Sequence, residues 1–163
     1  MTVEAVRTFL ARNAPDLEVL ELDASTATVE MAARGHGVVP AQIAKTLSLR
    51  IKDRALLIVT SGDARLNNRK IKGVLGGKPR MLGADEVVML TGHPVGGVCP
   101  FGLATPLPVY CDISLKEFDE VVPAAGSTNS AVRIAPERMA SLVGAEWIDV
   151  CERPGTPAEA AQP

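Results

Sequence analysis

The chain has 163 residues, 47% of them hydrophobic and 22% charged, and its formal net charge at pH 7 is −2. This length suits one ordinary domain, and the composition is typical of a folded globular protein rather than a disordered one. Aromatic residues make up only 3% of the chain, which argues against a module that stacks bases on exposed rings.

Cysteine and histidine are too scarce and too scattered for a metal site. The three cysteines form no CxxC pair, and the only histidines are His36 and His93. We therefore expect no disulfide framework, no metal and no cofactor. The N-terminal segment lacks the apolar run of a signal peptide, and no stretch reaches about 18 uninterrupted apolar residues. These features predict a cytoplasmic protein with no membrane segment.

The first half of the chain alternates short helices and strands. Its hydrophobic periodicity predicts a helix over 2–12, a strand over 17–22, a helix over about 25–33 and a helical turn over 40–44. A β-hairpin follows, with a strand of alternating polarity over 45–51, a turn at 52–54 and a continuous apolar strand over 55–60. Because it is apolar throughout, we expect this second hairpin strand to be buried on both faces.

The second half opens with a helix over 66–75, which should bury Ile71, Val74 and Leu75. The remaining elements are predicted in order: a strand over 79–82, a helix over 84–90, strands over 109–111, 117–123 and 131–134, a helix over 136–143 and a strand over 147–150. Residues 152–163 are predicted to be a disordered tail, which leaves 1–151 as a single domain. Without a regular βαβ repeat, the order of elements favours an α+β fold with a mixed sheet.

Basic residues are concentrated in one part of the chain. Between residues 45 and 80, ten Lys and Arg face two Asp, so this stretch carries a net charge of +8 on an acidic protein. Such a stretch could bind a polyanion or could be a solvated helix face. DNA binding is the weakest interpretation, because no recognition helix is evident. Four of these basic residues belong to the segment around the 66–75 helix: Arg65, Arg69, Lys70 and Lys72.

The loop over 91–108 holds four glycines and four prolines, and it is too apolar for a linker. Gly96, Gly97 and Gly102 would let backbone N–H groups approach a carbonyl or an oxyanion, although they could equally form a structural turn. Cys99 is either a thiol with a pKa lowered by these amides or a small packing residue. Lys45, at the start of a strand, could hold a phosphate or simply be solvated.

Four segments together resemble the YbaK/ProX family of aminoacyl-tRNA deacylases, which also includes the editing domain of bacterial prolyl-tRNA synthetases. The resemblance covers about residues 1–150. It is carried by AQIAKTLSLR with Lys45, by VTSGDARLNNRKIKGVLG, by LTGHPVGGVCPFGL, and by the pair PVYCDISL and VVPAAGSTNSAVRI. The glycine-rich segment is the most specific of the four.

The resemblance implies a mixed, β-barrel-like sheet surrounded by helices, and hydrolysis of the ester that joins a wrong amino acid to tRNA. A synthetase pocket rejects a similar side chain by only about 10–200-fold, so a second sieve is chemically useful. In this family water is the nucleophile; Lys45 would hold the terminal nucleotide or aminoacyl group, and backbone amides of Gly97, Val98 and Cys99 would polarise the ester carbonyl. Lys45 and Gly97 are therefore our expected catalytic residues.

Further contacts follow from the same resemblance. The expected substrate contacts are Thr46, Gly96, Val98, Cys99, Pro100, Phe101, Gly126 and Ser127. The expected contacts to the tRNA backbone are Arg65, Arg69, Lys70 and Lys72. The implied partners are mischarged tRNA and an aminoacyl-tRNA synthetase, with no membrane and no DNA.

Two departures from the family pattern limit the substrate assignment. Members that remove alanine carry Asn after the lysine and a histidine near the last strands. Here Thr46 follows Lys45, and no histidine lies beyond His93. Two other functions are alternatives to a tRNA-editing hydrolase: a non-catalytic module that binds tRNA or a nucleotide, and an enzyme that depends on Cys99.

Overall fold

The computed structural model describes residues 2–152. The predicted tail lies outside the described residues except for Glu152, which belongs to a strand. The α-helices are α1 (Thr2–Asn13), α2 (Val29–His36), α3 (Asn68–Leu75), α4 (Ala84–Thr91) and α5 (Pro136–Val143), and the 3-10 helices are η1 (Pro40–Gln42) and η2 (Ile113–Glu117).

The main sheet is mixed and has six strands. Its order is β5-β2-β3-β6-β9, and β7 pairs with β2 beyond this path. These strands are β2 (Ile43–Ile51), β3 (Arg54–Ser61), β5 (Pro79–Met81), β6 (Val109–Asp112), β7 (Val122–Pro123) and β9 (Glu146–Ile148). Two smaller pairs complete the strands: β1 (Leu20–Glu21) with β8 (Ser130–Ala131), and β4 (Arg65–Leu66) with β10 (Cys151–Glu152).

The predicted α+β fold with a mixed sheet is confirmed. β2 runs antiparallel to β3, whereas β3 and β6, and β6 and β9, are parallel. The expected barrel-like closure is wrong, because β5 and β9 remain the two edges of the sheet in the part of the chain that the structure describes.

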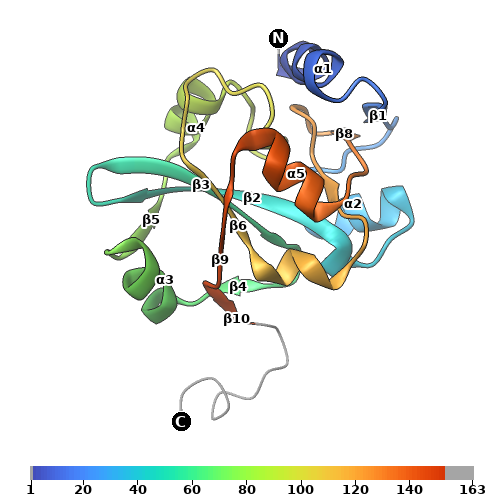
Figure 1. The fold of residues 1–163 in the computed structure, drawn as a ribbon. Helices are drawn as coiled ribbons and strands as arrows, with labels where there is room; N and C mark the ends of the chain where they lie inside the picture. The colour runs from blue at the N-terminus through green and yellow to red at the C-terminus, as the bar shows by residue number, and fades with distance from the viewer. Residues whose placement is uncertain (1, 153–163) are drawn as a thin grey trace.

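The β2–β3 hairpin runs through the middle of the molecule, with α1 and α3 on opposite sides of it (Figure 1). Strand β3 is buried on both faces, as its apolar sequence predicts. Leu57 and Val59 pack in the larger core cluster, while Leu56 and Ile58 pack in a second cluster on the other face. This double burial makes the hairpin a rigid support for the side chains of β2.

Side-chain caps move two helix starts away from their predicted positions. Thr28 accepts a hydrogen bond from the backbone N–H of Met31, so α2 begins at Val29 rather than near residue 25. Asn67 caps α3 in the same way through Lys70 N–H. The prediction that Val74 is buried is wrong: this residue is 49% exposed, and Ile71 is the residue of the helix that is fully buried.

The strand predicted over 117–123 is also wrong in its first half. Asp112 caps η2 by accepting a hydrogen bond from Ser114 N–H at 2.9 Å; η2 extends to Glu117, and residues 118–120 form a bend rather than a strand. Only Val122–Pro123 form a strand, and it pairs with the first two residues of β2. This short pairing brings β7 to the end of β2 where the candidate site lies.

Candidate functional site

A cavity of about 250 Å³ lies against β2 and is enclosed by segments from both halves of the chain. Its wall is largely apolar, with Val29, Ile43, Val87 and Val122 among its lining residues. Polar side chains interrupt this wall at a few positions, namely Thr26, Thr28, His36, Lys45, Thr46, Ser48 and Ser130. An apolar cavity with few polar groups is the usual form of a small-ligand site.

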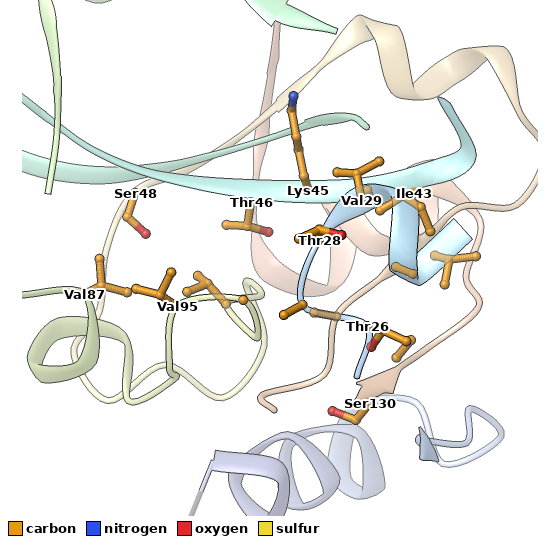
Figure 2. A pocket seen from close by; sticks show the side chains of 18 of the residues that line it. Thr26, Thr28, Val29, Ile43, Lys45, Thr46, Ser48, Val87, Val95 and Ser130 are labelled. Carbon is orange, nitrogen blue, oxygen red and sulfur yellow. The ribbon is translucent and has the colours of Figure 1, made fainter. Parts of the chain in front are cut away.

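Two neighbouring residues of β2 point to opposite sides of the strand. In Figure 2, Thr46 and Ser48 project from one side of β2 and Lys45 from the other. Alternation along a strand produces this division. The resemblance to the family placed Lys45 and Thr46 at one site. In the structure their polar ends face different surroundings.

The ammonium of Lys45 is held at the end of β3. Its Nζ donates a 2.7 Å hydrogen bond to the carbonyl oxygen of Ala64. Burial lowers the pKa of Lys45 below its ordinary value, and the nearby Arg65 guanidinium adds to this effect while Asp63 opposes it. Because an ammonium has three N–H donors, this hydrogen bond leaves donors for an anionic ligand.

The glycine-rich loop is fixed against the turn that precedes β8. Gly126 N–H donates to Gly97 O at 3.0 Å, and a Cβ on Gly97 would lie 2.7 Å from the Ser127 backbone. Gly96 has a φ of 92° and lines the cavity. Gly97 N–H donates to Pro94 O at 2.9 Å, so this amide is engaged within the loop rather than directed at a ligand.

Val98 follows Gly97 in this loop, and its N–H is not bonded within the loop. It lines the cavity. Among the described residues no acceptor contacts the N–H groups of Val98 or Cys99. Loop amides without an internal acceptor can stabilise a carbonyl oxygen or an oxyanion.

Cys99 lies in the core and not on the cavity wall. Its side chain is fully buried, and burial raises its pKa to about 12, which favours the packing residue over the reactive thiol of the two alternatives. Its Sγ lies 3.7 Å from His93 Nε2, and His93 Nε2 lies 2.8 Å from Phe101 O. Phe101 is fully buried too, and its ring packs against Phe9 at 5.9 Å between centroids.

The remaining predicted substrate contacts do not line the cavity. Pro100 is buried. Gly126 contacts the loop, and the Ser127 hydroxyl lies 2.6 Å from the Ser130 hydroxyl. Of the predicted set, the cavity is lined by Lys45, Thr46, Gly96 and Val98 and not by Gly97, Cys99, Pro100, Phe101, Gly126 or Ser127.

Several lining residues were missed by sequence reasoning. His36 is the main one, and Ser48 and Ser130 are others. A signal for His36 exists in the sequence: Val29, Ala32 and His36 are spaced by three and four residues, so they share one face of a helix. The others come from strands that meet only in the folded chain.

The predicted tRNA contacts all lie on the surface of the protein. Arg65, Arg69 and Lys72 are exposed. Lys70 is exposed as well, but its Nζ donates to Asp149 Oδ1 and to Cys151 O, both at 3.0 Å. Arg65 follows directly after Ala64, whose carbonyl oxygen accepts from Lys45, so this one arginine of the set lies near the ammonium.

Residues 2–152 contain neither a candidate metal site nor a candidate membrane span. No three His, Cys, Asp or Glu side chains lie together in an arrangement that could hold a metal ion. No helix in this range is long and apolar enough to cross a membrane.

The fold and the site define a small mixed α/β protein whose cavity is built between a lysine-bearing hairpin and a glycine-rich loop. A model of the aminoacyl-tRNA editing domain matches residues 23–142. The chain belongs to the aminoacyl-tRNA editing domain family.

Individual relatives agree with this assignment. The chain is 46% identical over 154 residues to the "Uncharacterized protein YwhH" of Bacillus subtilis (strain 168), covering 93% of this chain and 98% of the relative. It is 32% identical over 107 residues to a proline–tRNA ligase of Citrifermentans bemidjiense, covering 65% of this chain but only 19% of the ligase.

A solved structure described as "a putative trans-editing enzyme for prolyl tRNA synthetase" superimposes with a TM-score of 0.86 at 36% identity. The match covers 93% of this chain and 97% of that one. The resemblance to this family, which was predicted from sequence motifs, is thus confirmed. Membership of the family supports a role in tRNA deacylation.

Proposed function

We propose that this protein is a trans-editing hydrolase that removes a wrongly attached amino acid from tRNA. The observation that carries the proposal is the cavity, which joins Thr46 of β2 to Val98 of the glycine-rich loop. At about 250 Å³ it is smaller than the roughly 300–1,000 Å³ of a drug-sized pocket. It suits one aminoacyl group, with the rest of the tRNA outside.

The reaction is ester hydrolysis. The oxygen of water attacks the ester carbonyl carbon, the bond from this carbon to the ribose oxygen breaks, and the ribose oxygen takes up a proton. In our proposal Val98 N–H donates to the carbonyl oxygen, where negative charge develops, because Gly97 N–H is already bonded to Pro94 O. The proton transfers are assigned to water and to groups of the substrate.

Lys45 and the basic surface are assigned to the tRNA. With one hydrogen bond to Ala64 O, Lys45 Nζ keeps donors for a phosphate of the terminal nucleotide. The exposed side chains of Arg65, Arg69 and Lys72 continue this positive surface, and we assign them to more distant phosphates. Lys70 contributes less in this scheme, because Asp149 already neutralises it.

The proposed substrate also indicates the setting and a partner. Proline–tRNA ligases contain a matching segment within a much longer chain, whereas this protein would act on tRNA released by a synthetase. A cytoplasmic location follows from a substrate that is made there, and transient contact with a prolyl-tRNA synthetase would deliver it.

The test is a deacylation panel with purified protein. tRNA(Pro), tRNA(Ala), tRNA(Thr) and tRNA(Cys), each charged with Ala, Ser, Thr, Cys or Pro, are incubated with wild type and Lys45→Ala. Lysine-dependent hydrolysis of one or two of these pairs supports the proposal. Tight tRNA binding without hydrolysis of any pair would favour the non-catalytic binding module instead.

A further inference from the structure

Four exposed apolar residues belong to the segment that runs from β5 through α4 into the glycine-rich loop, namely Met81, Val88, Met89 and Val95. Two of them, Met81 and Val95, also line the cavity, and each is 59% exposed. Side chains that line a cavity and also face solvent lie at its mouth, and we call this pair the apolar rim. Apolar surface that gathers at one place is typical of a binding site.

Both residues of the apolar rim lie at the same end of the cavity. The cavity follows β2 from Ile43 to Ser48. Leu82 N–H donates to Ser48 O at 3.0 Å, which holds the neighbouring Met81 at the Ser48 end. Figure 2 shows Val95 on the same side of the view as Ser48 and away from Ile43. The two exposed side chains therefore belong to one apolar surface at this end of the cavity.

The proposed function identifies what covers this surface, and the inference rests on it. With the aminoacyl group inside the cavity, its ester bond lies at the mouth, and the ribose and the adenine of the terminal nucleotide follow immediately outside. Adenine has two flat aromatic faces, which are less polar than its edge. Covering one of these faces with apolar side chains removes apolar surface of both partners from water, which favours binding.

The side chains of the apolar rim suit such a face. The Met81 thioether is polarisable and makes favourable contacts with aromatic rings, and Val95 supplies a branched aliphatic surface. No Phe, Tyr or Trp of the described residues lines the cavity, so a thioether and an aliphatic surface take the place of stacked rings. A packing contact of this kind depends on the flat face of the base and not on its hydrogen-bonding edge.

We propose that Met81 and Val95 bind the adenine base of the terminal nucleotide by packing on its face, and thereby hold the ester at the loop that carries Val98. Val88 and Met89 are exposed on the same segment but do not line the cavity, so they take no part in this contact. They are matched controls, because they have the same side-chain chemistry. A protein docked on this segment would instead cover all four apolar side chains.

The first test follows the methionine methyl groups of the whole protein by NMR. The probes are adenosine analogues that carry alanyl or seryl through a 3′-amide, which resists hydrolysis, and the same analogues with hydrogen in place of the base. We expect the base to tighten binding by about fivefold or more and its ring current to shift the Met81 methyl signal, while the Met89 signal stays in place. Equal affinities with and without the base, equal shifts of the two signals, or failure of every analogue to bind would overturn the inference.

Variants test the same contact through binding and catalysis. Met81→Gln keeps an unbranched side chain but replaces the thioether with a polar amide, and Val95→Thr replaces a methyl group with a hydroxyl at nearly constant volume. Because both residues are exposed, Tm should change little. In the double variant the affinities with and without the base should come within about twofold of each other, and kcat/KM for deacylation should fall about fivefold or more.

Met89→Gln is the matched control and should keep the wild-type preference for the base and the wild-type kcat/KM. An unchanged preference for the base in the folded double variant would overturn the inference. An equal loss of kcat/KM in Met89→Gln would also overturn it, because that result would assign the whole segment to a docked protein.

Deacylation measured in parallel distinguishes the two proposals. If the base tightens binding and shifts the Met81 signal but no aminoacyl-tRNA is hydrolysed, the proposed function fails and the base-binding role of the apolar rim stands. If aminoacyl-tRNA is hydrolysed at the wild-type rate by the double variant, the role of the apolar rim fails and the proposed function stands.

Discussion

Lys45 Nζ lies 2.7 Å from the carbonyl oxygen of Ala64. It projects from the side of β2 opposite to the hydroxyls of Thr46 and Ser48 (Figure 2). The polar ends of Lys45 and Thr46 thus face two different surroundings. One is a positively charged surface that includes Arg65, and the other is a cavity with an apolar wall. This division matches the two chemical parts of an aminoacyl-tRNA end, a phosphate and an amino acid.

Replacing Lys45 with methionine should therefore weaken substrate binding more than it disturbs the fold. Methionine keeps the apolar stem but removes the charge and the hydrogen bond to Ala64, and a hydrogen bond from a charged group contributes about 1.5–3 kcal/mol. We expect kcat/KM for deacylation to fall at least tenfold, with a change in Tm of a few degrees. Lys78→Met, at an exposed lysine away from the cavity, is the matched control. A wild-type rate for Lys45→Met would contradict the assignment.

Cys99→Ser should retain activity. A thiol whose pKa is raised to about 12 by burial is a thiolate in only about one molecule in 10⁵ at pH 7. Serine keeps a donor for Phe101 O, to which the Cys99 thiol donates at 3.7 Å. We expect kcat within twofold of wild type in a single-turnover deacylation assay, with a modest decrease in Tm. Loss of hydrolysis in a protein with native circular dichroism would restore the cysteine-dependent mechanism.

Gly97→Ala should destabilise the site through backbone contact. An added Cβ would lie 2.7 Å from the carbonyl carbon and oxygen of Ser127, and overpacking of this kind typically costs about 1–3 kcal/mol. We expect a lower Tm and a lower deacylation rate together. Gly73→Ala is the control: a Cβ there meets nothing within 4 Å in α3, so it should raise stability by about 0.5–1 kcal/mol. Equal effects of the two substitutions would rule out the loop contact as a constraint.

The basic surface makes a prediction about salt dependence. Arg69→Gln combined with Lys72→Gln removes two exposed charges and should reduce the slope of log K for tRNA binding against log salt by roughly 1.5. Lys70→Gln should change the slope less, because Lys70 Nζ is bonded to Asp149 and to the Cys151 carbonyl. Filter binding at several salt concentrations measures both. An equal or larger effect from Lys70 would show that the ion pair opens on binding.

Local signals in the sequence were sufficient where an element is defined by its own residues. The helix over 136–143 has its predicted bounds, because Pro136 starts it and Gly144 ends it with a φ of 66°. The β2–β3 hairpin was likewise expected from its alternating and apolar strands. The strand predicted over 117–123 is wrong in its first half, because η2 extends to Glu117 and residues 118–120 form a bend before β7.

Site features that depend on distant contacts were out of reach. Nothing near Lys45 in the sequence indicates that its ammonium binds the carbonyl of Ala64, 19 residues away. The packing of Gly97 on Ser127 joins segments 30 residues apart. The role of Cys99 was left open between a reactive and a packing residue, and its burial in the core decides for packing.

The ion pair between Asp16 and Arg138 predicts a loss of stability in acid. The two guanidinium nitrogens donate to the Asp16 carboxylate at 2.8 and 2.5 Å, joining the segment after α1 to α5. The hydrogen bonds from Arg138 lower the pKa of Asp16 from 3.8 to about 2. Because the folded-state pKa is below the unfolded one, this pair stabilises the protein fully above about pH 4 and progressively less as the pH falls toward 2.

Asp16→Asn should therefore lower Tm at pH 7, and its difference from wild type should shrink between pH 4 and pH 2. Arg138→Gln should show the same pH dependence, and the double variant should be no less stable than the less stable single variant if the two residues act as a pair. Thermal unfolding followed by circular dichroism at pH 7, 4, 3 and 2 measures all four proteins. Because both side chains are exposed, the effect should be small and should decrease in high salt. A difference that grows as the pH falls would have the wrong sign for this ion pair.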